Sequence, residues 1–277
     1  MTRSNPLVSH RLMAVDIGNS AWKFGFFDLP AIGDPGSRYP YPIDDRRDAD
    51  ESFPNLTAWL DILLRHGHKE RLTWVVAGVN RARKASFLDW LAANRPDDLL
   101  CQIKTADVPM ANLYDNPDQL GVDRLLGALA AWRMAGNPVM IVDIGTASKI
   151  DWVDGNGTFR GGAIFPGPQT AARSLGEKTD QLPIQVNLDS SVRWPATNTA
   201  DAIRCGIHTS QIGAVCHCYQ AAQEISGTLP RVILTGGGAR NLEEELAKLI
   251  PGKVQTTRDL VLSGIFLTFL TLNISSH

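Results

Sequence analysis

Hydrophobic residues along this chain fall into short β-branched runs that alternate with stretches in which apolar positions recur at helical spacing. Two of the short runs end in nearly the same phrase. Residues 13–20 read Met-Ala-Val-Asp-Ile-Gly-Asn-Ser, and residues 140–147, 127 positions further on, read Met-Ile-Val-Asp-Ile-Gly-Thr-Ala. The repeat predicts two similar half-molecules that face each other across a cleft.

The first half of the chain alternates strands with helices. Apolar runs predict strands over residues 12–15, 21–28, 72–79 and 102–104, and helical spacing predicts helices over 56–66, 86–94 and 120–134. Residues 29–54 contain five prolines, which indicates a loop or an irregular insertion.

The second half repeats this scheme. Its pattern predicts strands over 138–142, 148–153, 158–165 and 231–234, and helices over 169–175, 199–225, 242–249 and 259–275. We expect the long helix to be broken or kinked near Gly206 and Gly213. Strands that alternate with helices indicate the α/β class. We expect a boundary near Gly136, with domains over 1–135 and 136–277.

Composition narrows the function more than the fold. Of 277 residues, 44% are hydrophobic and 20% charged, as in a soluble globular protein, and the net charge of −2 does not favour a nucleic-acid partner. We find neither a signal-peptide core nor a run of about 18 apolar residues, so we expect no membrane span. The four scattered cysteines favour a reducing cytosol over a disulfide framework, and hence a cytoplasmic protein.

The turn after the first apolar run carries residues suited to phosphate. Asp16 ends the run, and Gly18 lets the backbone approach a ligand closely. Asn19 and Ser20 can hydrogen-bond a phosphate, and Lys23 can reach one as a point charge. Taken alone, the same residues are also typical of an ordinary hairpin turn, and it is the second copy that favours phosphate binding.

The second turn has the same pattern in Asp143, Gly145 and Thr146. It suits the opposite side of a phosphate chain. Asp143 can hold a cation directly or through water, because hard cations prefer oxygen ligands. A simple turn carboxylate is the alternative.

A third candidate, Gly121-Val122-Asp123-Arg124, opens the helix at 120–134. An acidic residue near a helix N-terminus often serves the helix dipole alone. An ionised Asp123 can also accept a proton from a substrate hydroxyl, and Arg124 can bind an anionic group with its planar fork. Both interpretations stay open from the residues alone.

Two glycine clusters, at 161–167 and 235–239, follow predicted strands. Such clusters are typical of backbone contact with a ligand, and also of tight turns and close packing. No Walker-type loop, dinucleotide fingerprint or nucleophile elbow occurs in the sequence. A bound nucleotide would therefore rely on the two Asp-x-Gly turns.

Paired Asp-x-Gly hairpins with a late Gly-Gly-Gly turn resemble the superfamily of sugar kinases, acetate kinase and actin-like ATPases. Within it, five ordered motifs resemble type III pantothenate kinase. They are Asp16-x-Gly-Asn-Ser-x-x-Lys23, Gly121-x-Asp-Arg124, Asp143-x-Gly-Thr-Ala147, Gly161-Gly-x-Ile-x-Pro-Gly167 and Asn198-Thr199-x-x-Ala202-Ile203-x-x-Gly206. The resemblance implies two similar actin-like, ribonuclease H-like domains, with mixed sheets flanked by helices and facing a central cleft.

The resemblance also implies ATP-dependent phosphorylation of the primary hydroxyl of pantothenate, the first step of coenzyme A synthesis. The residues that would bind ATP are Asp16, Gly18, Asn19, Ser20, Lys23 and Thr146. Those that would line the pantothenate pocket are Tyr114, Gly121, Val122, Asp123, Arg124 and Thr199, with Asp123 as the proton acceptor. Asp143 would ligate a monovalent cation, potassium or ammonium. Magnesium would accompany ATP, and the chain would form a homodimer.

This chain departs from the family pattern in three places. Ser20 stands where Thr is usual and keeps the hydroxyl. Lys149 stands where the second motif usually has another Thr, so that its charge either adds a phosphate contact or disturbs the cation site at Asp143. The insertion at 29–54 has no clear counterpart.

Two other functions stay open from the sequence. One is a catalytically weak regulatory or accessory protein on the same fold. The other is a kinase that phosphorylates a different small molecule.

Overall fold

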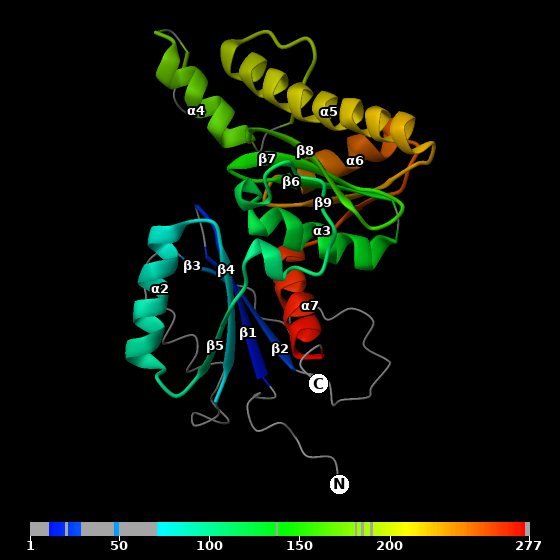
Figure 1. The fold of residues 1–277 in the computed structure, drawn as a ribbon. Helices are drawn as coiled ribbons and strands as arrows, with labels where there is room; N and C mark the ends of the chain where they lie inside the picture. The colour runs from blue at the N-terminus through cyan, green and yellow to red at the C-terminus, as the bar shows by residue number, and fades with distance from the viewer. Residues whose placement is uncertain are drawn as a thin grey trace. The chain divides into compact units, whose positions relative to one another are not determined.

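The computed structural model of this chain describes residues 11–19, 22–28, 47–49, 71–136, 138–180, 182–183, 186–188 and 191–274 (Figure 1). They belong to two compact units. Unit 1 takes in Met1–Pro109, Asn116–Ala130 and Asp259–His277, and unit 2 takes in Met110–Asp115 and Ala131–Arg258. Each unit is built around one five-stranded sheet.

The sheet of unit 1 has the strand order β3-β2-β1-β4-β5. Its strands are β1 (Arg11–Ile17), β2 (Trp22–Asp28), β3 (Arg47–Ala49), β4 (Thr73–Gly78) and β5 (Leu99–Gln102). The pairs β1–β2 and β2–β3 are antiparallel, whereas β1–β4 and β4–β5 are parallel. The buried central strand β1 therefore has an antiparallel neighbour on one side and a parallel neighbour on the other.

The sheet of unit 2 has the order β10-β9-β6-β7-β8. Its strands are β6 (Val139–Ile144), β7 (Ala147–Val153), β8 (Phe159–Pro166), β9 (Arg231–Thr235) and β10 (Val254–Thr256). Here β6–β7 and β7–β8 are antiparallel and β6–β9 and β9–β10 are parallel, so unit 2 repeats the topology of unit 1 strand for strand. The predicted α/β class and mixed sheets are confirmed, while the central cleft stays a prediction.

Helices flank both sheets. They are α2 (Arg81–Asn94), α3 (Val122–Ala135), α4 (Pro168–Lys178), α5 (Thr199–Ser226), α6 (Arg240–Leu249) and α7 (Leu260–Ile274), with 3₁₀ turns at Thr105–Asp107 and Pro117–Gln119. Every strand and helix expected within the described residues is present. The expected strand at 102–104 is observed three residues earlier, and the short strands β3 and β10 were not expected.

Two expectations need separate mention. The helix expected at 56–66 and most of the insertion at 29–54 lie outside the described residues. The predicted break in the long helix is wrong, because α5 runs without interruption through Gly206 and Gly213. Neither glycine has an atom within 4 Å of the position a Cβ would take, so no neighbour forces the backbone to bend there.

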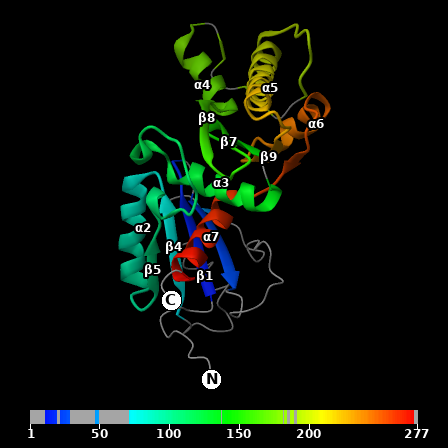
Figure 2. The ribbon, with the colours of Figure 1, turned by 45° about the vertical axis from the view of Figure 1, so that its right-hand side comes forward.

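Alternating side chains divide the sheet of unit 1 into two covered faces. Met13, Val15 and Ile17 of β1 join Phe87 and Leu91 of α2 in one apolar cluster. On the other face, the ring of Phe27 stacks on Phe266 of α7 with centroids 4.6 Å apart. Because side chains alternate along a strand, Asp16 and its cross-strand partner Lys23 lie on this second face. Figure 2 shows α7 lying along the strands of unit 1.

The helix α7 explains why the two units are not the continuous segments 1–135 and 136–277. Although α7 ends the chain, its buried residues pack on the sheet of unit 1. Gly264 lets it approach α3 closely, since a Cβ there would lie 2.2 Å from the carbonyl oxygen of Leu126. Residues 110–115, by contrast, precede α3 in the chain but belong to unit 2. Within that unit, Phe159 donates its backbone N–H to the carbonyl of Ala111.

In unit 2, α5 and α6 pack on one face of the sheet. Met140, Val142 and Ile144 of β6 form a cluster with Tyr219 of α5 and Leu246 of α6. Asp143 and Lys149 alternate with these positions and lie on the opposite face, as Asp16 and Lys23 do in unit 1. Among the described residues, no helix is long and apolar enough to cross a bilayer.

We expect Phe266→Ala to lower the free energy of unfolding by about 3–5 kcal/mol, because Phe266 is only 1% exposed and its loss leaves a cavity against Phe27. Chemical denaturation measures this change. The control is Leu249→Ala on α6, where the leucine is 55% exposed and the expected loss is within about 0.5 kcal/mol. Equal losses in the two variants would show that α7 does not belong to the core of unit 1.

Candidate functional site

The first Asp-x-Gly turn ends the central strand of unit 1. Asp16 is buried and faces Lys23 across the hairpin, with Lys23 Nζ 3.9 Å from Asp16 Oδ2. This distance is longer than that of a charge-assisted hydrogen bond, for which about 2.7–2.9 Å is usual. The side chain of Lys23 is 34% exposed. It therefore carries a positive charge that a ligand phosphate can reach.

The next part of this turn is hydrogen-bonded to the start of α2. The side-chain oxygen of Asn19 accepts a hydrogen bond from Asn80 Nδ2 at 3.3 Å. Asn80 is the N-cap of α2 and accepts from the backbone N–H of Arg83 at 3.0 Å. Gly18 follows the strand as expected, and Ser20 lies outside the described residues. The cap therefore positions the turn, and its signal in the sequence was an Asn just before a helix.

The second turn reproduces the same cross-strand arrangement in unit 2. Asp143 pairs in register with Lys149, as Asp16 pairs with Lys23. Lys149 Nζ lies 2.9 Å from Asp143 Oδ2, which makes a direct ion pair. Lys149 is thus the structural counterpart of Lys23, which its place in the linear motif did not reveal.

A difference in loop length explains why Lys23 and Lys149 do not align in the two linear motifs. Four residues, 18–21, separate the paired Ile17 and Trp22 of the first hairpin. Three residues, 145–147, separate the paired Ile144 and Ser148 of the second. A lysine seven positions after Asp16 and one six positions after Asp143 consequently occupy the same place in the ladder.

The second turn is packed against two glycines of the 235–239 cluster. Gly236 has a φ of 89°, and a Cβ on it would lie 2.4 Å from the carbonyl oxygen of Ile144 and 2.5 Å from Asp143 Oδ1. Gly238 donates its N–H to the same carbonyl at 3.1 Å. A Cβ on Gly238 would also meet Ile144 Cγ2 at 2.5 Å. The glycines therefore serve close packing, and this packing places the Asp143 carboxylate.

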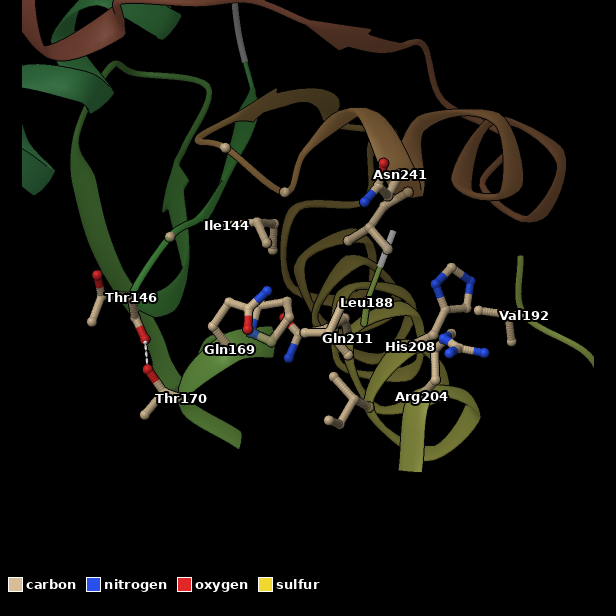
Figure 3. A pocket seen from close by; sticks show the side chains of 16 residues that line it. Ile144, Thr146, Gln169, Thr170, Leu188, Val192, Arg204, His208, Gln211 and Asn241 are labelled. Carbon is tan, nitrogen blue, oxygen red and sulfur yellow. Dashed lines mark hydrogen bonds between the residues drawn. The ribbon is translucent and has the colours of Figure 1, made fainter. Parts of the chain in front are cut away.

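A cavity of about 330 Å³ lies beside this turn, wholly within unit 2 (Figure 3). It is bounded by the β6–β7 turn, the first residues of α4, the side of α5, the start of α6 and the turn at residues 235–239, called the glycine turn below. The polar side chains that line it include Thr146, Gln169, Arg204, His208, Gln211 and Asn241. Its volume is at the lower end of the range of small-ligand pockets, about 300–1,000 Å³.

The cavity lies close to the strands because the β6–β7 turn contacts α4 directly. The backbone carbonyl of Thr146 accepts hydrogen bonds from Thr170 Oγ1 at 2.6 Å and from the N–H of Gly167 at 3.1 Å. Gly167 is required, since a Cβ there would lie 1.9 Å from the carbonyl oxygen of Gly145. Figure 3 shows the bond between Thr146 and Thr170 at one side of the cavity. Of the residues expected to bind ATP, Thr146 is the one that lines it.

Three polar residues of α5 reach the cavity at the spacing of one helix face. Arg204 donates to the carbonyl of Asn187 at 2.7 Å and to Asp201. Hydrogen bonds from Asn198 and from Arg204 lower the pKa of Asp201, so that its carboxylate stays ionised beside the guanidinium. The ion pair keeps Arg204 aimed along the cavity wall.

The other two polar residues of α5 are also held by neighbours. His208 Nε2 lies 2.6 Å from Glu245 Oε2 of α6. Gln211 accepts from Ser148 Oγ at 2.5 Å and donates to the carbonyl of Pro166 at 3.2 Å. Sequence reasoning missed these cavity residues. The available signal was three polar residues, at positions i, i+4 and i+7, on a helix that is otherwise apolar on its buried side.

The start of α3 carries the predicted acceptor site in unit 1. Asp123 lies in the first helical turn, and a Cβ on Gly121 would lie 2.5 Å from Asp123 Oδ1. Arg124 is buried, and its N–H donates to the carbonyl of Gly121 at 3.1 Å. Val122 is buried too. Gly121 thus gives the Asp123 carboxylate room beside the backbone at the helix N-terminus.

Tyr114 and Thr199 belong to unit 2, so the predicted pantothenate residues are divided between the two units. The ring of Tyr114 lies 3.8 Å from where a Cβ on Gly161 would stand, and its centroid is 6.5 Å from that of Phe159. Thr199 is exposed in the first turn of α5 and does not line the cavity. The structure brings Thr146 to the cavity but leaves Thr199 outside it.

Comparison with known proteins gives one family. A family model described as "Type III pantothenate kinase" matches residues 12–221. A type III pantothenate kinase from Agathobacter rectalis is 33% identical over 266 residues, which cover 95% of this chain and 98% of that protein.

Solved structures support the same fold. A Baf family transcriptional activator from Campylobacter jejuni superposes with a TM-score of 0.53 at 18% identity, over 95% of this chain and 99% of that one. A 2-dehydro-3-deoxygalactonokinase protein from Sinorhizobium meliloti gives a TM-score of 0.51 at 14% identity, over 94% and 99%. The fold is thus shared with both of these proteins.

We expect Gly236→Ala to destabilise the protein by about 1–3 kcal/mol, because an alanine would have to keep a left-handed φ while its Cβ meets the backbone of Ile144. Thermal or chemical unfolding measures this. Gly237→Ala is the matched control, since no atom lies within 4 Å of its Cβ position and no loss is expected. If both variants unfold alike, the close approach of the two turns does not contribute to stability.

Proposed function

The chain belongs to the type III pantothenate kinase family, and on that premise we propose that it transfers the γ-phosphoryl group of MgATP to the primary hydroxyl of pantothenate. This reaction opens coenzyme A synthesis. The single observation that carries the proposal is the pair of matched hairpins, in which each Asp-x-Gly turn ends a buried central strand and sets a lysine opposite its aspartate. Phosphoryl transfer mainly requires positioned phosphates and neutralised charge, which such turns supply.

Nucleotide binding is assigned to both turns and to the cavity. In unit 2, the cavity receives the nucleoside part of ATP, with Thr146 at its edge. In unit 1, Gly18, Asn19, Ser20 and Lys23 bind the phosphates near Asp16. The partial exposure of Lys23 and its long distance from Asp16 support this role, because its ammonium group is not consumed by a short ion pair.

The acceptor alcohol is assigned to the start of α3. Asp123 accepts the proton of the pantothenate hydroxyl as the oxygen attacks the γ-phosphorus, and the bond to the bridging oxygen breaks to release ADP. Arg124 binds the pantothenate carboxylate, and Gly121, Val122, Tyr114 and Thr199 complete the pocket. Proton transfer by a positioned carboxylate contributes about 10²- to 10⁴-fold to such a rate.

The residues around Asp143 do not fit the monovalent cation that the family resemblance implies. The ammonium group of Lys149 lies 2.9 Å from the Asp143 carboxylate, where that cation would bind. We therefore assign no step to potassium or to free ammonium.

The proposal extends to assembly and location. A homodimer and a cytoplasmic site of action accompany the family resemblance. Light scattering of the purified protein would measure twice the mass of the 277-residue chain for the dimer.

The first test is ADP release by purified protein with MgATP, in the presence and absence of pantothenate. We expect turnover that depends on pantothenate and yields a phosphorylated product. Nucleotide binding with no turnover on any acceptor would favour an accessory protein instead. Turnover on another alcohol or carboxylate, with none on pantothenate, would favour a kinase of a different small molecule.

The second test concerns the proton acceptor. We expect Asp123→Asn to lower kcat by about 100-fold or more, because the amide cannot accept the hydroxyl proton. The folded state should persist, as judged by the melting temperature. Asp118→Asn is the control, since Asp118 is an exposed residue of the neighbouring 3₁₀ turn, and its turnover should equal that of the unaltered protein. An active Asp123→Asn variant would remove Asp123 from the mechanism.

A further inference from the structure

The ion pair at the second turn differs from its counterpart at the first. Both lysines stand opposite an aspartate in the same register. The Nζ–Oδ2 distance is 3.9 Å for Lys23 and Asp16 but 2.9 Å for Lys149 and Asp143. The same topology thus holds one lysine away from its carboxylate and the other directly on it.

The charges of the second pair are partly shielded from water. The side chain of Lys149 is 20% exposed and that of Asp143 is 25% exposed. In such surroundings an opposite charge at hydrogen-bonding distance interacts more strongly than at a fully exposed site. Asp143 Oδ1, the other carboxylate oxygen, faces Gly236, where a Cβ would lie 2.5 Å away. One oxygen therefore meets the ammonium group and the other the glycine turn.

A second cation on this carboxylate would be placed beside a positive charge already in contact with it. Like charges at such a separation repel, and the ammonium group satisfies the carboxylate by a charge-assisted hydrogen bond. The group that Lys149 supplies is also an ammonium ion, carried on the chain itself. Because this ammonium group is attached to the chain, its effective concentration at Asp143 is high and does not depend on the salt in the medium.

We propose that Lys149 replaces the monovalent cation of this kinase, so that turnover requires neither potassium nor free ammonium. The inference rests on the proposed function, since it concerns the same phosphate site. Lys149 acts as a fixed positive charge beside the β6–β7 turn, where it takes the place of the cation on the Asp143 carboxylate. It is a positioning and charge-neutralising residue, and it takes no part in proton transfer.

The first experiment compares turnover in potassium, sodium and choline chloride at matched ionic strength. We expect kcat/KM for MgATP to differ by less than about twofold among the three salts, because a tethered charge does not depend on bulk salt identity. An increase of about tenfold or more in potassium, corresponding to about 1.4 kcal/mol, would overturn the inference. Absence of turnover in every salt would count against the proposed function and not against the role of Lys149.

The second experiment uses binding in place of activity. The variant Lys149→Thr restores an oxygen in place of the charge, and we expect potassium, but not choline, to raise its melting temperature in the presence of a non-hydrolysable ATP analogue. The unaltered protein should show equal melting temperatures in both salts. A potassium-specific rise of the same size in the unaltered protein would show that the cation binds beside Lys149, and the inference would fail.

Two control variants separate charge from general damage. Lys149→Arg keeps the positive charge and should stay indifferent to potassium in both experiments. Lys253→Thr makes the same change at an exposed lysine just before β10 and should behave as the unaltered protein does. If Lys149→Thr folds with an unchanged response to potassium, Lys149 does not stand in for the cation.

Discussion

The close approach of the β6–β7 turn to the glycine turn before α6 is the constraint on which the site of unit 2 depends. The carbonyl of Ile144 accepts a hydrogen bond from the N–H of Gly238. Gly236 lies so close to that carbonyl and to the Asp143 carboxylate that no side chain fits on it. The same contact forms one side of the cavity and determines which oxygen of Asp143 remains for Lys149.

The two units show how one topology can carry different charge arrangements. Strand order, strand direction and cross-strand register agree between them, and each central strand ends at an aspartate opposite a lysine. The first hairpin has one more loop residue, and its lysine stands 1.0 Å further from the carboxylate than the second, 3.9 Å against 2.9 Å. The more distant lysine, Lys23, can bind a ligand phosphate. Lys149, in direct contact, neutralises the charge of its own aspartate. The two turns are thus alike in topology, and the distance between lysine and aspartate distinguishes their chemistry.

Polar side chains of α5 illustrate how the cavity acquires its lining from residues that no motif marks. Arg204 is held by Asp201 and His208 by Glu245, while Gln211 joins β7 and β8 through Ser148 and Pro166. Each of these groups is therefore oriented before a ligand arrives, which lowers the entropy lost on binding. The remaining wall combines glycines and apolar residues with a few polar side chains, among them Thr146, Gln169 and Asn241, as is common in small-molecule sites.

Much of the fold followed from local patterns, because strand and helix periods depend on which side chains must be buried. The two Asp-x-Gly phrases predicted the repeated hairpins, which the structure confirms. Spacing could not place α7 with the sheet of unit 1, since that depends on the contact of Phe266 with Phe27, residues 239 positions apart in the chain. It could not find the contact of Asn80 with Asn19 or that of Arg204 with Asn187, because these partners lie outside the helices that Asn80 and Arg204 belong to.

The sequence by itself determined the α/β class, the duplicated turns and the family, because these rest on residue types at short spacing. Only the tertiary structure decided which lysine faces which aspartate, and at what distance. Register across a hairpin depends on loop length as well as on motif position, and the pairing of Asp143 with Lys149 became visible only when the ladder of β6 and β7 was formed. Electrostatic contact follows distance in space, which linear spacing does not specify.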